Sequence, residues 1–434
     1  MPIGARLRPL LTTLLMVGIA SAGVAYGQGR GGMPGGIAAP GGMPMPGPPD
    51  WAGNSSDRAA TGLERADAPQ EQRLSRPQTD RAAAIAKAAP ENYELDRSGA
   101  LAIRAEVLVT GLDAARLARI ERAGFSVLRR SEIPDLGISL AVVTHEGMSA
   151  TRALERLRRI DPDGAYDLNH VFFESGAGVV GGPAAAAPAA TGGGTAVVGL
   201  IDTGVADTVD SSPGIRVLRR SFAPGESSAG LHGTAVATLI ARKPGRVTIY
   251  AADIFGVGPR GGTAELLVRA LGWMANQKVP VINVSMVGPA NGLVSNVVRD
   301  LTGRGFTIVA PVGNDGSAAK LLFPASYPGV IAVSAADTNG RLLPEASRVK
   351  RVDFVGPGIA TVSDLTGRAT IVRGTSFAAP VVSRLIADYV RAPDPVSARQ
   401  AIARLSQSAV RPRSGGSWFG HGLIGVAVPD AAMR

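Results

Sequence analysis

The chain has 434 residues, of which 45% are apolar, and a formal net charge of +10. This length and composition allow one large globular domain with smaller parts, and they exclude a wholly disordered protein. Cysteine is absent, which excludes disulfides, thiolate metal sites and a cysteine nucleophile. From residue 176 onward there are 25 Lys and Arg against 15 Asp and Glu. These charges are scattered among few aromatic residues, which predicts a solvated basic surface and no nucleic-acid site.

Residues 1–25 have the three parts of a secretory signal peptide. Arg6 and Arg8 precede an apolar run over residues 10–20, and small residues follow up to Ala25. Because the run is too short to favour a membrane-spanning helix, we expect a cleaved signal peptide, with an uncleaved N-terminal anchor as the alternative. The mature protein is then expected to be secreted or periplasmic, without stable insertion in a membrane, and monomeric.

The next part of the chain predicts a spacer followed by a small domain. Residues 26–99 are first dense in Gly, Pro and Met and then polar and Ala-rich, a composition typical of a flexible segment. Residues 100–174 follow the order strand, helix, strand, strand, helix, strand, which is typical of a split ferredoxin-like α+β domain. The strands are expected at 102–110, 125–130, 138–143 and 169–173, and the helices at 112–123 and 149–160.

A linker and a large α/β domain complete the expected organisation. Residues 175–194 are almost wholly Gly, Ala, Pro and Val, a composition typical of exposed segments that proteases cut. Over residues 195–434 short Val- and Ile-rich runs alternate with helical stretches. The strands are expected at 197–201, 248–252, 281–286, 307–312 and 330–335, and the helices at 233–242, 263–276, 293–302 and 377–390. This alternation predicts a mainly parallel sheet flanked by helices on both faces.

Two candidate catalytic residues lie in the first half of the α/β domain. Asp202 ends an apolar strand, at the position where parallel sheets collect functional groups, although a turn aspartate that caps the next segment is the plainer alternative. His232 opens the stretch HGTAVA over residues 232–237, and its small neighbours would allow another element to approach closely. The chain has three other histidines, at positions 145, 170 and 421, so a surface or structural role for His232 is also open.

Two further candidates lie in the second half of the domain. Ser376 directly precedes an apolar helix, where it would either cap the helix or act as a nucleophile whose oxyanion is stabilised by the N–H groups of the helix start. Asn314 follows a strand in the loop GNDG over residues 313–316, which is either a common turn or the source of a second oxyanion donor. Together the candidates occur in the order Asp, His, Asn, Ser, and Asp-His-Ser is one of three convergent triad orders.

The sequences around these residues resemble the motifs of the subtilisin-like (subtilase) serine peptidase family. VGLIDTGV over residues 198–205 resembles its aspartate motif, HGT at 232–234 its histidine motif, GTSFAAP at 374–380 its serine motif and GNDG at 313–316 its oxyanion-hole motif. VINVS at 281–285 is similar to the strand beside bound substrate, and FGHGLI at 419–424 resembles the segment that closes such domains. The similarity covers roughly residues 195–434.

The resemblance implies a secreted serine endopeptidase with Asp202, His232 and Ser376 as its triad, and with Asn314 and the backbone of Ser376 as its oxyanion hole. It also implies that residues 100–174 are a propeptide that inhibits the enzyme within the same chain; DLNHVF at 167–172 resembles the last propeptide strand. The substrate, a polypeptide, would contact Ser285, Met286, Val287, Gly288, Val312, Gly313 and Leu322. Val287 and Leu322 stand where glycine is frequent in the family, so the primary pocket is expected to accept a small residue.

Several other functions remain as alternatives. A catalytically inactive subtilase-fold binding protein would share the fold, although the four chemical positions are present. An esterase or lipase is disfavoured because the chain has no Gly-x-Ser-x-Gly elbow, and a metal-dependent hydrolase because it has no His-Glu-x-x-His motif. No cofactor or catalytic metal is expected, and no carboxylate-rich loop indicates the structural calcium that is common in the family.

Overall fold

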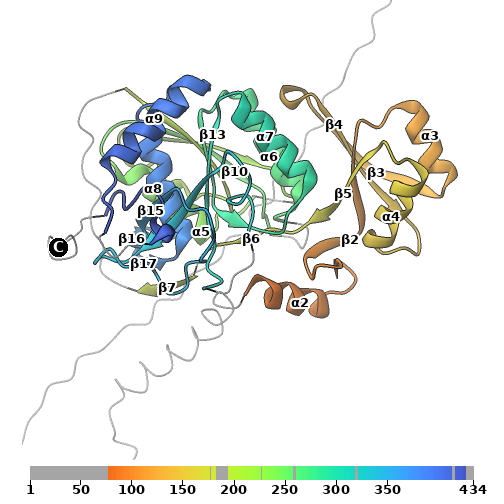
Figure 1. Ribbon diagram of the computed structural model, residues 1–434, viewed down its shortest axis with the longest axis horizontal. Helices are drawn as coiled ribbons and strands as arrows, with labels where there is room; N and C mark the ends of the chain where they lie inside the picture. Colours follow the sequence, from red (N-terminus) through yellow and green to blue (C-terminus); the bar gives the residue numbers. More distant parts are fainter. Residues whose placement is uncertain are drawn as a thin grey trace, which may run out of the picture. The chain divides into compact units, whose positions relative to one another are not determined.

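The computed structural model describes residues 77–175, 194–225, 227–257, 261–317, 321–412 and 416–426, and the backbone of 177–181 (Figure 1). The expected signal peptide, the first part of the expected spacer and most of the expected 175–194 linker lie outside these residues. Among the described helices, none is long and apolar enough to cross a membrane.

The N-terminal domain is a five-stranded antiparallel sheet with two helices, and four of its strands follow the expected βαββαβ order. Its strands pair in the order β5-β2-β4-β3. Helices α3 and α4 pack on one face of the sheet through a cluster that includes Val107, Ile120 and Leu157. The other face presents Leu108, Leu140 and Val142 to the core of the larger domain. The elements are β2 (Leu101–Thr110), α3 (Ala114–Arg122), β3 (Phe125–Ile133), β4 (Ile138–His145), α4 (Ala150–Ile160) and β5 (Ala165–His170).

Regular structure begins earlier than the sequence indicates. Within the segment expected as a spacer, residues Gln78–Ala88 form helix α2 and Tyr93–Leu95 form strand β1. Strand β1 pairs with the start of β2, and Ala82 of α2 packs against Phe173 with Leu101 and Ile103. The helix has a weak apolar periodicity of its own, so its stability comes from this packing, which the sequence does not reveal.

The C-terminal domain is built on a seven-stranded sheet in which every neighbouring pair is parallel. The strand order is β15-β14-β13-β11-β8-β10-β9. This sheet confirms the expected fold class. Its strands are β8 (Ala196–Asp202), β9 (Ile215–Ser221), β10 (Val247–Asp253), β11 (Val281–Val284), β13 (Thr307–Pro311), β14 (Ile331–Ala336) and β15 (Phe354–Pro357).

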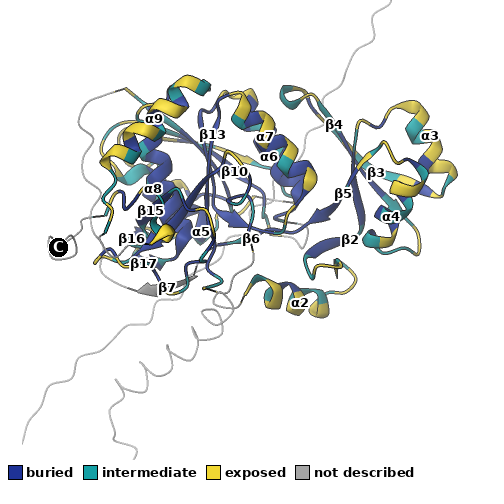
Figure 2. Ribbon diagram, viewed as in Figure 1, coloured by how far each residue is buried: buried dark blue, intermediate teal, exposed yellow. Residues whose placement is uncertain are grey.

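Helices cover both faces of this sheet because successive strand residues point to opposite sides. In β13, Ile308 packs with α6 and α7, whereas Val309 packs with α5 and α8. Helix α8 is buried along most of its length, whereas α9 exposes its outer side (Figure 2). The helices are α5 (Leu231–Arg242), α6 (Ala264–Asn276), α7 (Gly292–Gly303), α8 (Thr375–Ala387) and α9 (Pro395–Ser408), and a hairpin of β16 (Ile359–Ser363) and β17 (Ala369–Arg373) precedes α8.

Candidate active site

Asp202 and His232 are brought together by the end of β8 and the start of α5. The Nδ1 atom of His232 lies 2.8 Å from Oδ1 and 3.0 Å from Oδ2 of Asp202, and the carboxylate is fully buried. Gly233 makes this approach possible, because a Cβ atom there would lie 2.3 Å from the carbonyl oxygen of Thr203. The small size of Gly233, which follows His232, therefore allows the backbone after β8 to approach the start of α5 closely.

The electrostatic environment favours the charged form of the imidazole. Burial by itself would lower the pKa of His232, but the charge and hydrogen bond of Asp202, together with the charge of Glu174, raise this pKa above its ordinary value of 6.5. Asp202 thus orients the ring through Nδ1 and stabilises the imidazolium. The other ring nitrogen, Nε2, is buried and has no hydrogen-bond partner among the described residues.

Ser376 and Asn314 converge on one carbonyl group, that of Ser175. The Ser376 hydroxyl donates to this oxygen, and Nδ2 of Asn314 donates to it over 2.5 Å. The amide orientation of Asn314 is fixed because its Oδ1 accepts from the Thr375 backbone N–H at 3.0 Å. Within the described residues, the backbone N–H of Ser376 makes no hydrogen bond to this carbonyl. The hydroxyl is directed to Ser175 and not to Nε2 of His232.

Ser175 ends a segment that lies in the C-terminal domain as an added strand. Strand β6 (Phe173–Glu174) pairs antiparallel with β12 (Met286–Val287), with Phe173 opposite Val287. On the other side of the segment, the backbone N–H of Phe172 donates to the carbonyl of Gly262 at 2.7 Å. The tail of the N-terminal domain therefore lies between two edges of the C-terminal domain, in the manner of a peptide bound by strand addition.

The side chain of Phe172 fills a cradle formed by two glycines. It is fully buried, and a Cβ atom at Gly288 would lie 2.3 Å from its ring. A Cβ atom at Gly262 would lie 2.6 Å from its carbonyl oxygen and 2.7 Å from the ring of Phe255. Glycine at both positions is thus required for the backbone of the tail and its aromatic side chain to fit.

Ser285 contacts the start of α8. Its hydroxyl donates to the Ser376 carbonyl at 3.2 Å and accepts from Nδ2 of Asn283 at 2.7 Å. Oδ1 of Asn283 in turn accepts from the Ser383 hydroxyl at 3.0 Å. This buried chain of hydrogen bonds joins α8 to the end of β11, a role for Asn283 that the sequence does not indicate.

The residues expected to line the primary pocket lie close together. Val287, Val312 and Leu322 are almost fully buried. A Cβ atom at Gly313 would lie 2.4 Å from Cδ1 of Leu322 and 3.5 Å from Cγ1 of Val287. The branched side chains of Leu322 and Val287 therefore lie directly beside the backbone of Gly313.

Helix α2 contributes contacts that sequence reasoning missed. The Arg81 guanidinium lies 4.8 Å from the centroid of the Phe173 ring and donates to the Glu174 carbonyl at 3.4 Å. The backbone N–H of Gln78 donates to Oδ2 of Asp315 at 3.0 Å, and burial raises the pKa of that carboxyl. The segment between the expected signal peptide and small domain thus reaches the tail, although no motif indicates this contact.

A buried ion network joins the two domains. Arg129 of β3 lies between Glu106 of β2 and Glu265 of α6, with Nη1 3.0 Å from Oε1 of Glu106 and Nε 3.0 Å from Oε1 of Glu265. Both carboxylates are about 2% exposed. Asn169 accepts from the Glu265 backbone N–H at 3.1 Å, at the first turn of α6. The network lies outside the triad and holds the two domains in contact.

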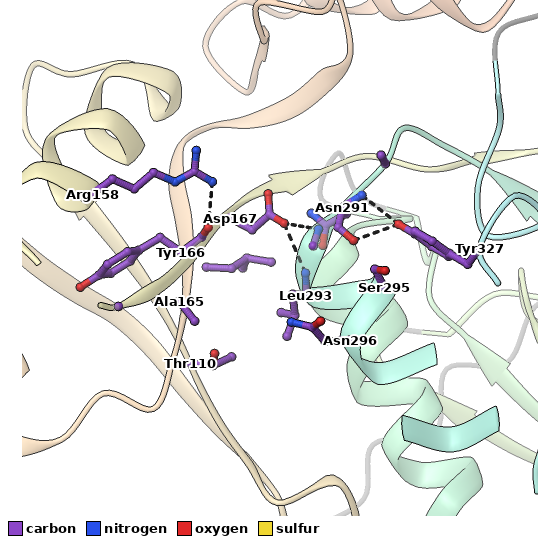
Figure 3. A pocket seen from close by; sticks show the side chains of 14 residues that line it. Thr110, Arg158, Ala165, Tyr166, Asp167, Asn291, Leu293, Ser295, Asn296 and Tyr327 are labelled. Carbon is purple, nitrogen blue, oxygen red and sulfur yellow. Dashed lines mark hydrogen bonds between the residues drawn. The ribbon is translucent and has the colours of Figure 1, made fainter. Parts of the chain in front are cut away.

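A cavity of about 580 Å³ lies between β5 and the start of α7 (Figure 3). Asp167 accepts from the backbone N–H groups of Gly292 and Leu293, the latter at 3.3 Å. Asn291, the N-cap of α7, donates to Nδ1 of His170 at 3.1 Å and accepts from the Tyr327 hydroxyl. The hydrogen bonds of this cavity connect the domains, and it contains no residue of the expected triad.

An aspartate–histidine pair, together with a serine at the start of a helix and an amide that both bind one carbonyl, is typical of serine hydrolases. The remaining histidines lie elsewhere: His145 and His170 belong to the N-terminal domain, and His421 packs against Phe354. Within the described residues, no group of three acidic or histidine side chains is arranged to hold a metal ion.

Comparison with known proteins identifies the family. Residues 193–422 match the model of the subtilase family. The chain is 30% identical to subtilisin DY of Bacillus licheniformis over 53% of its own length and 88% of that protein. It is 26% identical to the M-protease of Shouchella clausii, over 81% of this chain and 94% of the relative. The chain belongs to the subtilase family of serine peptidases.

A solved structure agrees with this fold. The chain superposes on fervidolysin from Fervidobacterium pennivorans, a keratinolytic enzyme related to subtilisin, with a TM-score of 0.62 and 20% identity. The superposition covers 79% of this chain and 63% of fervidolysin. It therefore extends beyond the C-terminal domain into the part of the chain that precedes it.

Proposed function

We propose that the chain is the precursor of a serine endopeptidase, and that it first cleaves its own peptide bond after Ser175. The observation that carries this proposal is the position of the Ser175 carbonyl, which accepts from both the Ser376 hydroxyl and the Asn314 amide. A carbonyl bound by a serine hydroxyl and by an amide donor, at the end of a strand-like segment, supports its role as the substrate of this site.

The chemistry follows from the side chains of the site. Ser376 transfers its hydroxyl proton to Nε2 of His232 and attacks the carbonyl carbon of Ser175, while the Asn314 amide stabilises the oxyanion. The imidazolium, stabilised by Asp202, then protonates the leaving amine, and an acyl-enzyme remains on Ser376. Water deprotonated by His232 releases the acid.

The attack requires a small movement of the nucleophile. The hydroxyl of Ser376 must turn from the carbonyl oxygen toward the free Nε2 atom of His232. The His232 ring lies beside the start of α8, with its centroid 5.3 Å from that of the Phe377 ring. The buried and unpaired state of Nε2 supports its role as the proton acceptor.

The same site supports a preference for small residues before the cut bond. Val287, Val312 and Leu322 fill the expected primary pocket, and the residue that precedes the proposed self-processing bond is itself small, Ser175. We propose that the mature enzyme cleaves polypeptides after Ala or Ser, with an aromatic or large apolar residue three positions earlier, where Phe172 fills its cradle.

Residues 77–174 act in this proposal as an intramolecular inhibitor, because their tail occupies the place of a substrate. The basic and apolar parts of residues 1–25 support export of the precursor, to the periplasm or the medium. The polypeptide substrate, and not a nucleic acid, is the partner of the mature enzyme.

Expression of the full chain and of its Ser376→Ala variant tests the proposal. The wild-type chain is expected to give a C-terminal product that begins at residue 176, as read by N-terminal sequencing, and the variant to remain uncut. A product with this N-terminus from the variant would overturn the assignment of Ser376. A wild-type chain that stays uncut and is not labelled by a fluorophosphonate would favour the inactive binding protein.

A further inference from the structure

The chain continues beyond the proposed cleavage site as part of a second sheet. Strand β7 (Ala177–Gly181) pairs antiparallel with β17, and β17 pairs antiparallel with β16. Ala177 is opposite Arg373 and Gly181 is opposite Thr370. The part of the chain that would leave after cleavage is therefore held as a strand from its second to its sixth residue.

Every second residue of β17 directs its backbone N–H and C=O groups toward β7, and the residues between them direct theirs toward β16. The N–H of Gly374 donates to the carbonyl of Gly358 on the β16 side at 2.9 Å. Because backbone groups alternate in direction along a strand, the N–H groups of Val372 and Thr370 also face β16, whereas those of Ile371 and Arg373 face β7. Release of β7 leaves this edge unpaired, ready to accept another strand.

The edge is held in place by the domain and does not depend on β7. Val372 is almost fully buried, in the cluster that contains Phe377 of α8. Arg373 forms a two-point ion pair with Glu345, with Nε 2.6 Å from Oε1 and Nη2 3.0 Å from Oε2. A preformed edge costs little ordering entropy when a peptide binds.

We propose that β17 is an extended docking edge for the leaving side of polypeptide substrates, reaching the sixth residue after the cut bond. This inference rests on the proposed peptidase function. The segment after the cut bond binds as an antiparallel strand through backbone hydrogen bonds, so its side chains contribute little to affinity. The segment must therefore be extended, and its backbone N–H groups must be free to donate. Together with β12 on the other side, this edge makes the cleft select long, unfolded substrates.

Peptides of two lengths test the edge with the self-processed enzyme. Both begin with residues 170–175 of the chain, and they continue to residue 177 or to residue 181, with amidated ends. The longer peptide is expected to have a kcat/KM about tenfold higher, as several additional strand hydrogen bonds would give. Proline in place of Val180 of the longer peptide is expected to remove most of this gain, because it removes a backbone N–H.

Equal kcat/KM values for the two lengths, or a proline peptide as good as its parent, would overturn the docking edge while the peptidase function stands. Failure to cleave any peptide would count against the peptidase function itself. These outcomes are therefore distinguishable with the wild-type enzyme alone.

Variants of β17 give an independent measurement. Ile371→Pro removes one N–H of the edge that faces β7, so the ratio of kcat/KM for the long and short peptides is expected to fall toward one. Leu365→Ala changes an exposed residue in the turn of the same hairpin and is expected to keep the wild-type ratio. A wild-type ratio in a folded Ile371→Pro enzyme, verified by its circular dichroism, would contradict the proposal.

Discussion

At the residue scale, the pKa of His232 links self-processing to pH. Burial lowers this pKa, but the neighbouring carboxylates of Asp202 and Glu174 raise it above the ordinary value. Glu174 belongs to the tail, so it contributes only while the tail is bound. Because Nε2 must be unprotonated to accept the hydroxyl proton, the rate of self-processing is expected to rise with pH through the pKa of His232.

The variant Glu174→Gln tests this link. Removing the negative charge lowers the pKa of His232, so the imidazole loses its proton at a lower pH, and the acid limb of the self-processing rate moves to lower pH. The rate is measured on gels over a series of buffers. The catalytic parts of both chains, once separated from their N-terminal fragments, should give superimposable pH profiles on a separate peptide, because residue 174 leaves with that fragment. An unchanged or higher midpoint for self-processing would contradict the prediction.

The primary pocket gives a second prediction at this scale. Leu322→Ala removes the side chain that lies against Gly313, so the pocket should accept larger residues. We expect kcat/KM for a peptide with Phe before the cut bond to rise at least tenfold relative to the Ala peptide. The reason is that each additional methylene-sized contact in a hydrophobic pocket changes kcat/KM by about tenfold or more. The hydrolysis of matched Ala and Phe peptides by both enzymes measures this. A wild-type enzyme that already prefers Phe would show that the pocket is not filled as described.

At the scale of elements, two helix starts of the C-terminal domain depend on the N-terminal domain. In the first turn of α6, a backbone N–H donates to the side chain of Asn169, and in the first turn of α7 a backbone N–H donates to Asp167. Side chains that accept from orphan N–H groups stabilise a helix start by about 0.5–2 kcal/mol each. Arg129 adds an ion network whose carboxylates are nearly inaccessible to water.

Arg129→Ala is therefore expected to weaken the precursor. It removes the nearer cation of Glu265 and leaves Arg269 at 3.9 Å. Removal of one partner of a buried pair costs about 3–5 kcal/mol, and the lower end is expected because Arg129 is one-third exposed and Arg269 remains. The free energy of unfolding is measured with denaturant in the uncut Ser376→Ala chain. Arg130→Ala, at the exposed neighbouring position, is the control and should cost less than about 0.5 kcal/mol. Equal losses in the two variants would contradict a specific role of the network.

The central strands could be predicted from the sequence, whereas the peripheral elements could not. Strands β8, β11 and β13 are buried on both faces, so they form continuous Val- and Ile-rich runs. Strand β9 lies at the edge of the sheet, and its sequence mixes apolar residues with three arginines, so it has no continuous apolar run that would predict a strand. Helix α9 and the β16–β17 hairpin were also not predicted, because they carry shorter apolar patterns.

The residues of the site also divide into those that a local motif predicts and those that depend on partners far away in the sequence. Asp202, His232, Asn314 and Ser376 were predicted because each stands in a short local motif next to a strand or helix end. Arg81 and Arg129 could not be found, because their partners lie 93 and 136 residues away in the sequence. Such pairs become visible only after the two domains are in contact.

At the scale of the whole molecule, cleavage after Ser175 is not expected to release the inhibitor at once. The cut removes one covalent bond, but the β6–β12 pairing, the packing of Phe172 and the Arg129 network all join residues before that bond to the C-terminal domain. The two products should therefore stay associated, with the tail still in the cleft.

Activity is accordingly expected to appear later than cleavage. In a time course of the wild-type precursor, the cut product seen on gels should precede hydrolysis of an added peptide, and the two fragments should elute together in size-exclusion chromatography during the delay. Arg129→Ala should shorten the delay, because the fragment dissociates faster without the ion pair between Arg129 and Glu265, whereas Arg130→Ala should not. If activity instead rises in step with the first cut in all three chains, the interdomain contacts do not hold the cleaved N-terminal part in place, and cleavage alone activates the enzyme.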